Sequence, residues 1–344
     1  MSTPFRLFSL PFLPLKKVLD NFTPQGIIII SLCSQRSKSI AVSYRGPSKD
    51  VKLQLMYYNA IDLCHDFTDL INVDNVSDLE HLEDPILPTV PIGKFRNVQY
   101  TMSEDTDEDC LVTYWYNQLT GLMEIGNYAR QLFNRDISQV NIGGTDMDDY
   151  KRLIKWTMDT QGYIENFHFE PENTLDEDLD YVLENVKCTG CLSITAKPSE
   201  NYRPAKPLVC DLDQLAIHYG FWIKQEDLLT INCRVVRMEG GSKLTSQDFN
   251  VFLKHWMTGG CSKLKLFHVS VEEVINYETI LDGVEFIARG DDVKREYVND
   301  ENTVDIMTGG FDVKRQSDNI TATITENSKR FYMNIWPDFA GNSY

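Results

Sequence analysis

Basic residues are scarce in this sequence of 344 residues, which has 33 lysines and arginines against 51 aspartates and glutamates. The formal net charge of −18 would repel a nucleic-acid backbone or an anionic membrane, so we expect neither as a partner. The shortage is uneven, because residues 1–49 carry a net charge of +6 and leave −24 for the remainder. A small basic head therefore precedes a large acidic body.

Long hydrophobic runs are absent too. The longest, four isoleucines at 27–30, is far shorter than the ~20 residues that span a bilayer. Pro4, Pro11 and Pro14 interrupt the apolar N-terminus and no small-residue cleavage pattern follows, so we expect no signal peptide. Eight irregularly spaced cysteines do not match a disulfide framework and favour a reducing compartment. We therefore expect a cytoplasmic or nuclear location.

The common catalytic motifs are missing as well. The sequence has no Walker loop, no dinucleotide-binding glycine motif, no His-Glu-x-x-His helix and no Gly-x-Ser-x-Gly elbow. We expect no catalytic residue and no cofactor, and hence a non-enzymatic protein. A cryptic hydrolase, with a cysteine and a histidine brought together only in space, stays open as an alternative.

Metal-binding patterns are incomplete. Cys188 and Cys191 form one Cys-x-x-Cys pair, but a zinc site needs a second pair or a histidine pair nearby. We expect these cysteines to be small buried side chains around a glycine that ends a helix. The acidic run at 104–109 imitates a calcium loop, but Cys110 and Tyr116 occupy the places that need glycine and glutamate. No metal site is predicted.

The head has the pattern of a compact helical module. The apolar residues that follow Leu10-Pro11 recur at helical spacing: Leu15, Val18 and Leu19. Thr23-Pro24 predicts the end of that helix and the start of another, and Gly46-Pro47 ends the module. Fewer than 50 residues rarely bury enough surface to be stable alone, so we expect the apolar side chains here to need a partner.

The next region predicts a hairpin and a helix. Residues 97–102 and 111–116 have the aromatic and β-branched content of strands, and the acidic run at 104–109 between them forms the predicted tip. Residues 121–133 have the apolar spacing of a helix.

Beyond residue 136, apolar doublets recur at short intervals. They are Val140/Ile142, Phe167/Phe169, Leu192/Ile194, Leu215/Ile217, Val236/Met238 and Leu264/Leu266. Helical patterns separate most of them, and Thr245 with Asp248 forms a capping box before the last. A strand and a helix at this period predict a leucine-rich-type solenoid with a concave parallel sheet, with an ordinary doubly wound sheet as the alternative.

The last segment alternates apolar and polar residues. Strands are predicted at 311–313, 322–325 and 331–336, separated by polar turns. The predicted fold class is α+β: an N-terminal all-α module, then an α/β leucine-rich-repeat-like solenoid that ends in antiparallel strands.

Two parts of the sequence resemble one family. The head resembles an F-box, particularly the nematode-expanded kind, in Leu10-Pro11, the proline break at 23–24 and Ser31-Leu32-Cys33-Ser34-x-Arg36. The body resembles the type 2 F-box-associated domain in Leu212-x-x-Leu215-x-Ile217, Gly220-x-Trp222-Ile223 and the segments 227–233, 244–256 and 263–265. The resemblance implies four ranges: an F-box at 4–47, a connecting α/β region at 48–136, the F-box-associated domain at 137–290 and C-terminal antiparallel strands at 305–338.

The family resemblance implies a substrate receptor of an SCF-type ubiquitin ligase. The F-box would dock on a Skp-type adaptor and, through it, a cullin, while the body captures an unidentified protein to be ubiquitinated. The acidity of the body favours a protein as the target, and a basic protein is one candidate. An adaptor-independent solenoid that mediates protein–protein interactions is the alternative.

The resemblance also selects the contact residues. The expected adaptor-binding residues are Leu10, Pro11, Leu15, Val18, Leu19, Leu32 and Cys33, unless they form only the core of a helical hairpin. Pro14 and Gln25-Gly26 depart from the family pattern, so we expect a late start of the first helix and weaker adaptor binding. Solenoid geometry would place the target-binding residues on the concave face: Asn141, His168, Glu170, His218, Arg237, Glu239 and Lys265.

Overall fold

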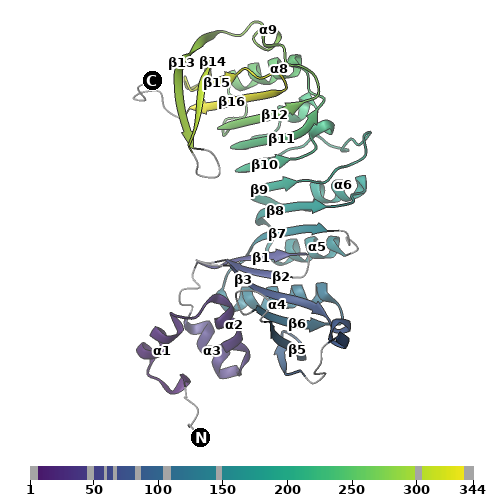
Figure 1. The fold of residues 1–344 in the computed structure, drawn as a ribbon, viewed down its shortest axis with the longest axis vertical. Helices are drawn as coiled ribbons and strands as arrows, with labels where there is room; N and C mark the ends of the chain where they lie inside the picture. Colours follow the sequence, from purple (N-terminus) through teal and green to yellow (C-terminus); the bar gives the residue numbers. More distant parts are fainter. Residues whose placement is uncertain are drawn as a thin grey trace. The chain divides into compact units, whose positions relative to one another are not determined.

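The computed structural model describes residues 7–44, 50–57, 60–64, 68–81, 87–103, 110–144, 149–298 and 304–336 (Figure 1). The chain divides into two compact units. Unit 1 comprises residues 1–168 with 185–187, and unit 2 comprises residues 169–184 with 188–344. Among the described residues, no helix is long and apolar enough to cross a membrane. The four ranges inferred from the family resemblance stay a prediction.

Unit 1 begins with helices. They are the 3-10 helix η1 (Leu7–Ser9) and the α-helices α1 (Phe12–Leu19), α2 (Pro24–Leu32) and α3 (Gln35–Tyr44). The expected late start of the first helix is wrong, because Pro14 lies in the first turn of α1, where a backbone N–H has no acceptor within the helix. Thr23 caps α2 by accepting a hydrogen bond from the Gly26 N–H.

The sheet of unit 1 follows these helices. Its strands are β1 (Lys52–Met56), β2 (Ala60–Cys64), β3 (Thr68–Asn75), β4 (Thr89–Ile92), β5 (Phe95–Ser103), β6 (Cys110–Trp115) and β7 (Ile137–Gly144), with η3 (Val76–His81), α4 (Gln118–Phe133) and α5 (Tyr150–Gln161) between strands or beyond them. Their order is β7-β1-β2-β3-β6-β5-β4, and only the pairs β7/β1 and β3/β6 are parallel. The predicted hairpin is confirmed as β5 and β6, and its acidic tip lies outside the described residues.

The helices at the N-terminus are part of unit 1 rather than a separate module. The Gln25 backbone N–H donates to Asp69 Oδ2 of β3 at 2.9 Å, and the Gln25 side-chain amide donates to the Leu70 carbonyl at 2.8 Å. Ser31 of α2 shares a 2.8 Å hydrogen bond with the Tyr128 hydroxyl of α4. The prediction of a separate all-α module is therefore wrong, because α2 is hydrogen-bonded to β3 and α4.

Unit 2 is a mixed sheet with helices between some of its parallel strands. The elements are β8 (Ile164–Pro171, which crosses the unit boundary), α6 (Asp176–Asn185), β9 (Cys188–Ile194), β10 (Gln214–Ile217), η4 (Gly220–Trp222), α7 (Gln225–Leu228), β11 (Val235–Ser242), α8 (Ser246–Met257), β12 (Leu266–Val271), α9 (Tyr277–Ile280), β13 (Phe286–Val298), β14 (Val304–Lys314), β15 (Thr321–Thr325) and β16 (Arg330–Trp336). β9 to β12 are parallel neighbours, and β16, β15, β14 and β13 continue the sheet in antiparallel order.

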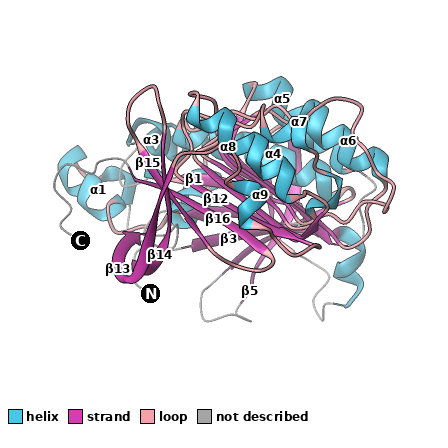
Figure 2. Cartoon of the chain, turned by 90° about the horizontal axis from the view of Figure 1, so that it is seen from above, coloured by secondary structure: helices cyan, strands magenta, loops and turns pink. Residues whose placement is uncertain are grey.

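The core of unit 2 lies between one face of this sheet and helix α8. Figure 2 shows α8 and α9 along one side of these strands. The Phe249 ring stacks on Phe331 of β16 at 4.5 Å between centroids, and the Phe252 ring stacks on Phe267 of β12 at 4.3 Å. The predicted capping box of Thr245 and Asp248 starts α8. Burial of this aromatic face stabilises the contact between helix and sheet.

The predicted leucine-rich-repeat-like solenoid is wrong. The sheet of each unit mixes parallel and antiparallel strand pairs, and a strand-plus-helix repeat accounts for only part of the described strands. Between β9 and β10 there is no helix, and between β10 and β11 there are only the short η4 and α7. In unit 2 the antiparallel strand β16 pairs with β12, so the tail extends the same sheet instead of following a finished solenoid.

Candidate functional site

One face of the unit 2 sheet is not used by the core. Along β11, β12 and β16 the residues Val236, Phe267 and Phe331 are buried, and successive side chains of a strand point to opposite faces. The alternate residues are Arg237, Glu239, His268, Ser270, Arg330 and Tyr332. Arg237 pairs with His268, and His268 pairs with Tyr332, so these side chains share the face opposite the core.

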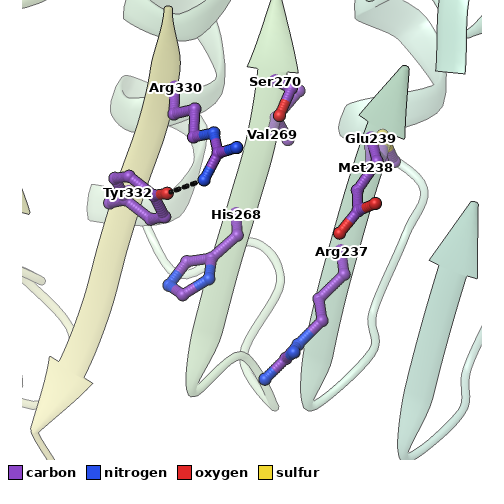
Figure 3. A pocket seen from close by; sticks show the side chains of 8 residues that line it. All are labelled: Arg237, Met238, Glu239, His268, Val269, Ser270, Arg330 and Tyr332. Carbon is purple, nitrogen blue, oxygen red and sulfur yellow. Dashed lines mark hydrogen bonds between the residues drawn. The ribbon is translucent and has the colours of Figure 1, made fainter. Parts of the chain in front are cut away.

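A pocket of about 190 Å³ lies on this face. It is lined by Arg237, Met238, Glu239, His268, Val269, Ser270, Arg330 and Tyr332. Figure 3 shows the three strands side by side, with His268 on the middle one. The predicted target-binding residues Arg237 and Glu239 both line this pocket, which makes it the candidate site.

Hydrogen bonds and ring contacts position the side chains of the pocket. The Arg330 guanidinium donates from Nη1 to the Tyr332 hydroxyl at 3.1 Å. His268 Nε2 lies 3.3 Å from Asn334 Oδ1, and the His268 ring meets the Tyr332 ring edge-on at 4.5 Å between centroids. The site is therefore held in place by neighbouring strands rather than by loops.

His218 joins this face from the end of β10. Its Nδ1 lies 3.4 Å from Glu239 Oε2, and both side chains are exposed. The structure thus brings together three of the predicted target-binding residues: His218, Arg237 and Glu239.

Lys265, another predicted target-binding residue, precedes β12, its N–H donates to the Arg234 carbonyl, and it does not line the pocket. Its role in target binding stays a prediction. Lys265 lies outside the pocket because of the strand register: Phe267 pairs with Val236 and continues the buried row, whereas the doublet Leu264/Leu266 was expected to do so. With Phe267 in the buried row, His268 and Ser270 point to the opposite face, so the sequence-based choice of doublet missed them.

The remaining predicted target-binding residues lie on other strands. Asn141 of β7 is half-buried in unit 1, where its side chain donates to Met56 Sδ at 2.8 Å and accepts from Gln139 at 2.9 Å. His168 and Glu170 both belong to β8, one half-buried and one exposed. None of these three lines the pocket. Arg330 and Tyr332 were missed because only tertiary structure places β16 next to β12.

The predicted adaptor-binding residues differ in exposure. Leu15 and Leu19 are buried, and Leu10, Val18 and Leu32 are half-buried, so only Pro11 and Cys33 are exposed. The most exposed apolar side chains of α1 are Phe12 and Leu13, with 66% and 72% of their surface accessible. Sequence reasoning missed them because the expected contact residues were taken from the family resemblance, which did not select Phe12 or Leu13.

Four of the described cysteines, Cys188, Cys210, Cys233 and Cys261, are poor nucleophiles. Burial raises the pKa of Cys188 to about 12 and the pKa of Cys233 and Cys261 to about 11, and it raises the pKa of Cys210 further. A thiol with a raised pKa holds little of the reactive thiolate at neutral pH. Cys188 begins β9, so the expected glycine at a helix end is wrong. In the described ranges, no group of three or more His, Cys, Asp and Glu fits a metal ion.

Comparisons with known proteins point to one family for part of the chain. Residues 204–269 match the F-box associated family. The chain is also similar to the Skn-1 dependent zygotic transcript 15 protein of Caenorhabditis elegans, with 22% identity over 96% of each chain. No solved structure matches the chain. The matched segment contains β10 and β11 and the first residues of β12, which include Arg237, Glu239 and His268 of the pocket.

Proposed function

We propose that this protein is a non-catalytic substrate-recognition subunit of an SCF-type ubiquitin ligase. In this proposal the N-terminal helices α1 to α3 of unit 1 bind a Skp-type adaptor and, through it, a cullin, while unit 2 binds the protein to be ubiquitinated. The observation that carries the proposal is the match of residues 204–269 to the F-box associated family. Such a receptor would act in the cytoplasm or nucleus and needs neither nucleic acid nor a membrane.

The exposed end of α1 supports adaptor binding. Phe12 and Leu13 present large apolar side chains beside the exposed Pro11. Full burial of such a side chain contributes about 1.5–3 kcal/mol, so a partner that covers both gains a substantial part of its binding energy here. Leu15 and Leu19 support this surface from within, because their buried side chains hold α1 in place.

The open face of unit 2 supports target binding. Its pocket is built from β11, β12 and β16, whose opposite faces form the core, so the polar side chains are not needed for packing. A rigid sheet that presents charged and aromatic side chains is suited to recognition of another protein. The raised pKa values of the buried thiols support a non-catalytic role.

Adaptor capture by the full chain tests the proposal. The intact protein should retain a purified Skp-type adaptor. The double variant Phe12→Ala, Leu13→Ala should retain at least about 90% less adaptor, because each truncation removes an apolar contact that the adaptor would bury. The matched control is Val209→Ala with Val274→Ala, two similarly exposed apolar residues of unit 2, with 75% and 68% of their surface accessible. If the intact chain does not retain the adaptor, the receptor proposal is refuted and the alternative of an adaptor-independent interaction protein is favoured.

A further inference from the structure

The helix that carries Phe12 and Leu13 is too short to be stable by itself. α1 has eight residues, and isolated helices shorter than about 12–15 residues are marginal in water. Leu15 and Leu19 are buried and attach one side of α1 to unit 1. Apolar burial has no preferred direction, so further contacts must fix the orientation of α1 and, with it, the direction of Phe12 and Leu13.

Helix α3 supplies one such contact at each end of α1. On the N-terminal side, the Arg36 guanidinium donates from Nη2 to the Phe8 carbonyl of η1 at 3.0 Å, and Pro11, whose ring fixes φ, connects η1 to α1. On the C-terminal side, the Tyr44 hydroxyl donates to Oδ1 of Asp20, the residue directly after α1. Figures 1 and 2 show α1 beside α3. Both ends of α1 are therefore hydrogen-bonded to the same neighbouring helix.

The stability of α1 alone does not account for Asp20. It is the C-cap residue, where a negative charge opposes the helix macrodipole. Its ion pair with Lys16, at 3.7 Å, is an exposed i,i+4 pair of the kind that contributes little. Burial and the hydrogen bond to Asp20 raise the pKa of Tyr44, so the Tyr44 hydroxyl stays protonated at neutral pH and remains a donor. The contact with α3 therefore accounts for an aspartate at this position.

We propose that Arg36 and Tyr44 are positioning residues of the adaptor-binding surface, which fix both ends of α1 so that Phe12 and Leu13 point in one direction. This inference rests on the proposed receptor function. Tyr44 is 8% exposed, so it acts through α1 and not by contact with the adaptor. A surface that is correctly oriented in only a fraction of the molecules binds more weakly in proportion to that fraction.

Adaptor affinity of full-length variants tests the inference at the C-terminal end of α1. Tyr44→Phe retains the ring and removes only the hydroxyl that donates to Asp20. Its affinity for a purified Skp-type adaptor should fall about three- to tenfold, as expected for the loss of one hydrogen bond. Tyr202→Phe is the matched control, because the Tyr202 hydroxyl donates to Asp180 at 2.7 Å within unit 2. This control should leave the affinity within about twofold.

Arg36→Gln tests the N-terminal end of α1. It removes the donor to the Phe8 carbonyl, so it should lower adaptor affinity in the same direction as Tyr44→Phe. Lys94→Gln makes the same change of charge at an exposed side chain elsewhere in unit 1. It should leave the affinity within about twofold, because a distant exposed charge is screened by salt.

Binding rates and hydrogen exchange separate positioning from direct contact. Tyr44→Phe should lower the association rate constant and leave the dissociation rate constant unchanged, because fewer free chains are correctly oriented while the bound state is the same. Leu13→Ala, which removes a direct contact, should mainly raise the dissociation rate constant. In the free chain, hydrogen exchange of the α1 amides should become about three- to tenfold faster in Tyr44→Phe and stay unchanged in Tyr202→Phe.

Two results would overturn the inference. Wild-type affinity in both Tyr44→Phe and Arg36→Gln would show that α1 is oriented without these hydrogen bonds. A change confined to the dissociation rate constant would show that the residues act by contact with the adaptor. Either result, with an adaptor that the wild-type chain retains, refutes this inference alone, whereas a wild-type chain that does not retain the adaptor refutes the proposed function.

Discussion

Arg295 of β13 and Asp312 of β14 form a buried, bidentate ion pair. Nη1 lies 2.8 Å from Oδ1 and Nη2 lies 2.8 Å from Oδ2, and Asp312 also accepts hydrogen bonds from Arg289 Nε and the Thr323 hydroxyl. Arg295 in turn lies over the Trp336 ring of β16, 5.8 Å from its centroid. These contacts connect the long β13–β14 hairpin to the last two strands of the sheet.

Removal of this charge should destabilise unit 2. Asp312→Asn leaves the Arg295 guanidinium buried without a counter-charge, which usually costs about 3–5 kcal/mol. The midpoint of urea unfolding should fall accordingly. Asp159→Asn is the control, because Asp159 pairs with Lys155 in an exposed i,i+4 arrangement that contributes only about 0.3–0.5 kcal/mol. Similar losses in both variants would contradict a special role of the buried pair.

The same carboxylate should make stability depend on acid pH. Burial alone would raise the pKa of Asp312, but hydrogen bonds from Arg295, Thr323 and Arg289 outweigh it and lower the pKa below its usual value. The stabilisation is therefore complete above the unfolded pKa of about 3.9 and is lost as pH falls further through the folded pKa. Melting temperatures measured from pH 7 downwards should show the wild type and Asp312→Asn converging only below about pH 4.

Contacts between α2 and β3 should control the local stability of the N-terminal helices. Gln25→Ala removes the hydrogen bond to the Leu70 carbonyl and should lower the local stability of α2 by about 1 kcal/mol. Hydrogen exchange of the α2 amides measures this change directly. Gln35→Ala, at the exposed start of α3, is the control and should leave α2 protection unchanged. Unchanged protection in Gln25→Ala would mean that α2 does not depend on this contact with the sheet.

Gly240 should be essential for the shape of β11 beyond the pocket. Its φ is +66°, and an added Cβ would lie 2.3 Å from the His218 carbonyl oxygen, so Gly240→Ala meets both strain and a backbone clash. Gly162 also has a positive φ, +82°, but a Cβ there meets nothing within 4 Å. Gly162→Ala should cost only the left-handed backbone penalty of about 1–2 kcal/mol, and Gly240→Ala should cost clearly more in thermal unfolding. An equal loss of stability in Gly240→Ala and Gly162→Ala would show that the backbone of β11 can shift to accommodate a side chain at residue 240.

Short-range signals in the sequence were enough to predict several local elements. The helix stop and start at Thr23-Pro24, the capping box at Thr245 and the hairpin on both sides of residues 104–109 all follow from short-range signals that neighbouring residues carry. It also indicated the F-box associated segment, which the match at residues 204–269 supports. Three residues of the open face, His218, Arg237 and Glu239, could be predicted from the sequence, because alternation along a strand shows which side chains point away from the core.

Which strands become neighbours followed from long-range packing and could not be predicted from the sequence. The pairing of β16 with β12 adds Arg330 and Tyr332 to the pocket, and the true register of β12 replaces Lys265 with His268. The same long-range pairing makes the sheet of unit 2 mixed, where a repeat of strand and helix predicted a solenoid. Spacing along the chain reports local geometry, whereas strand order and register depend on packing between residues far apart in sequence.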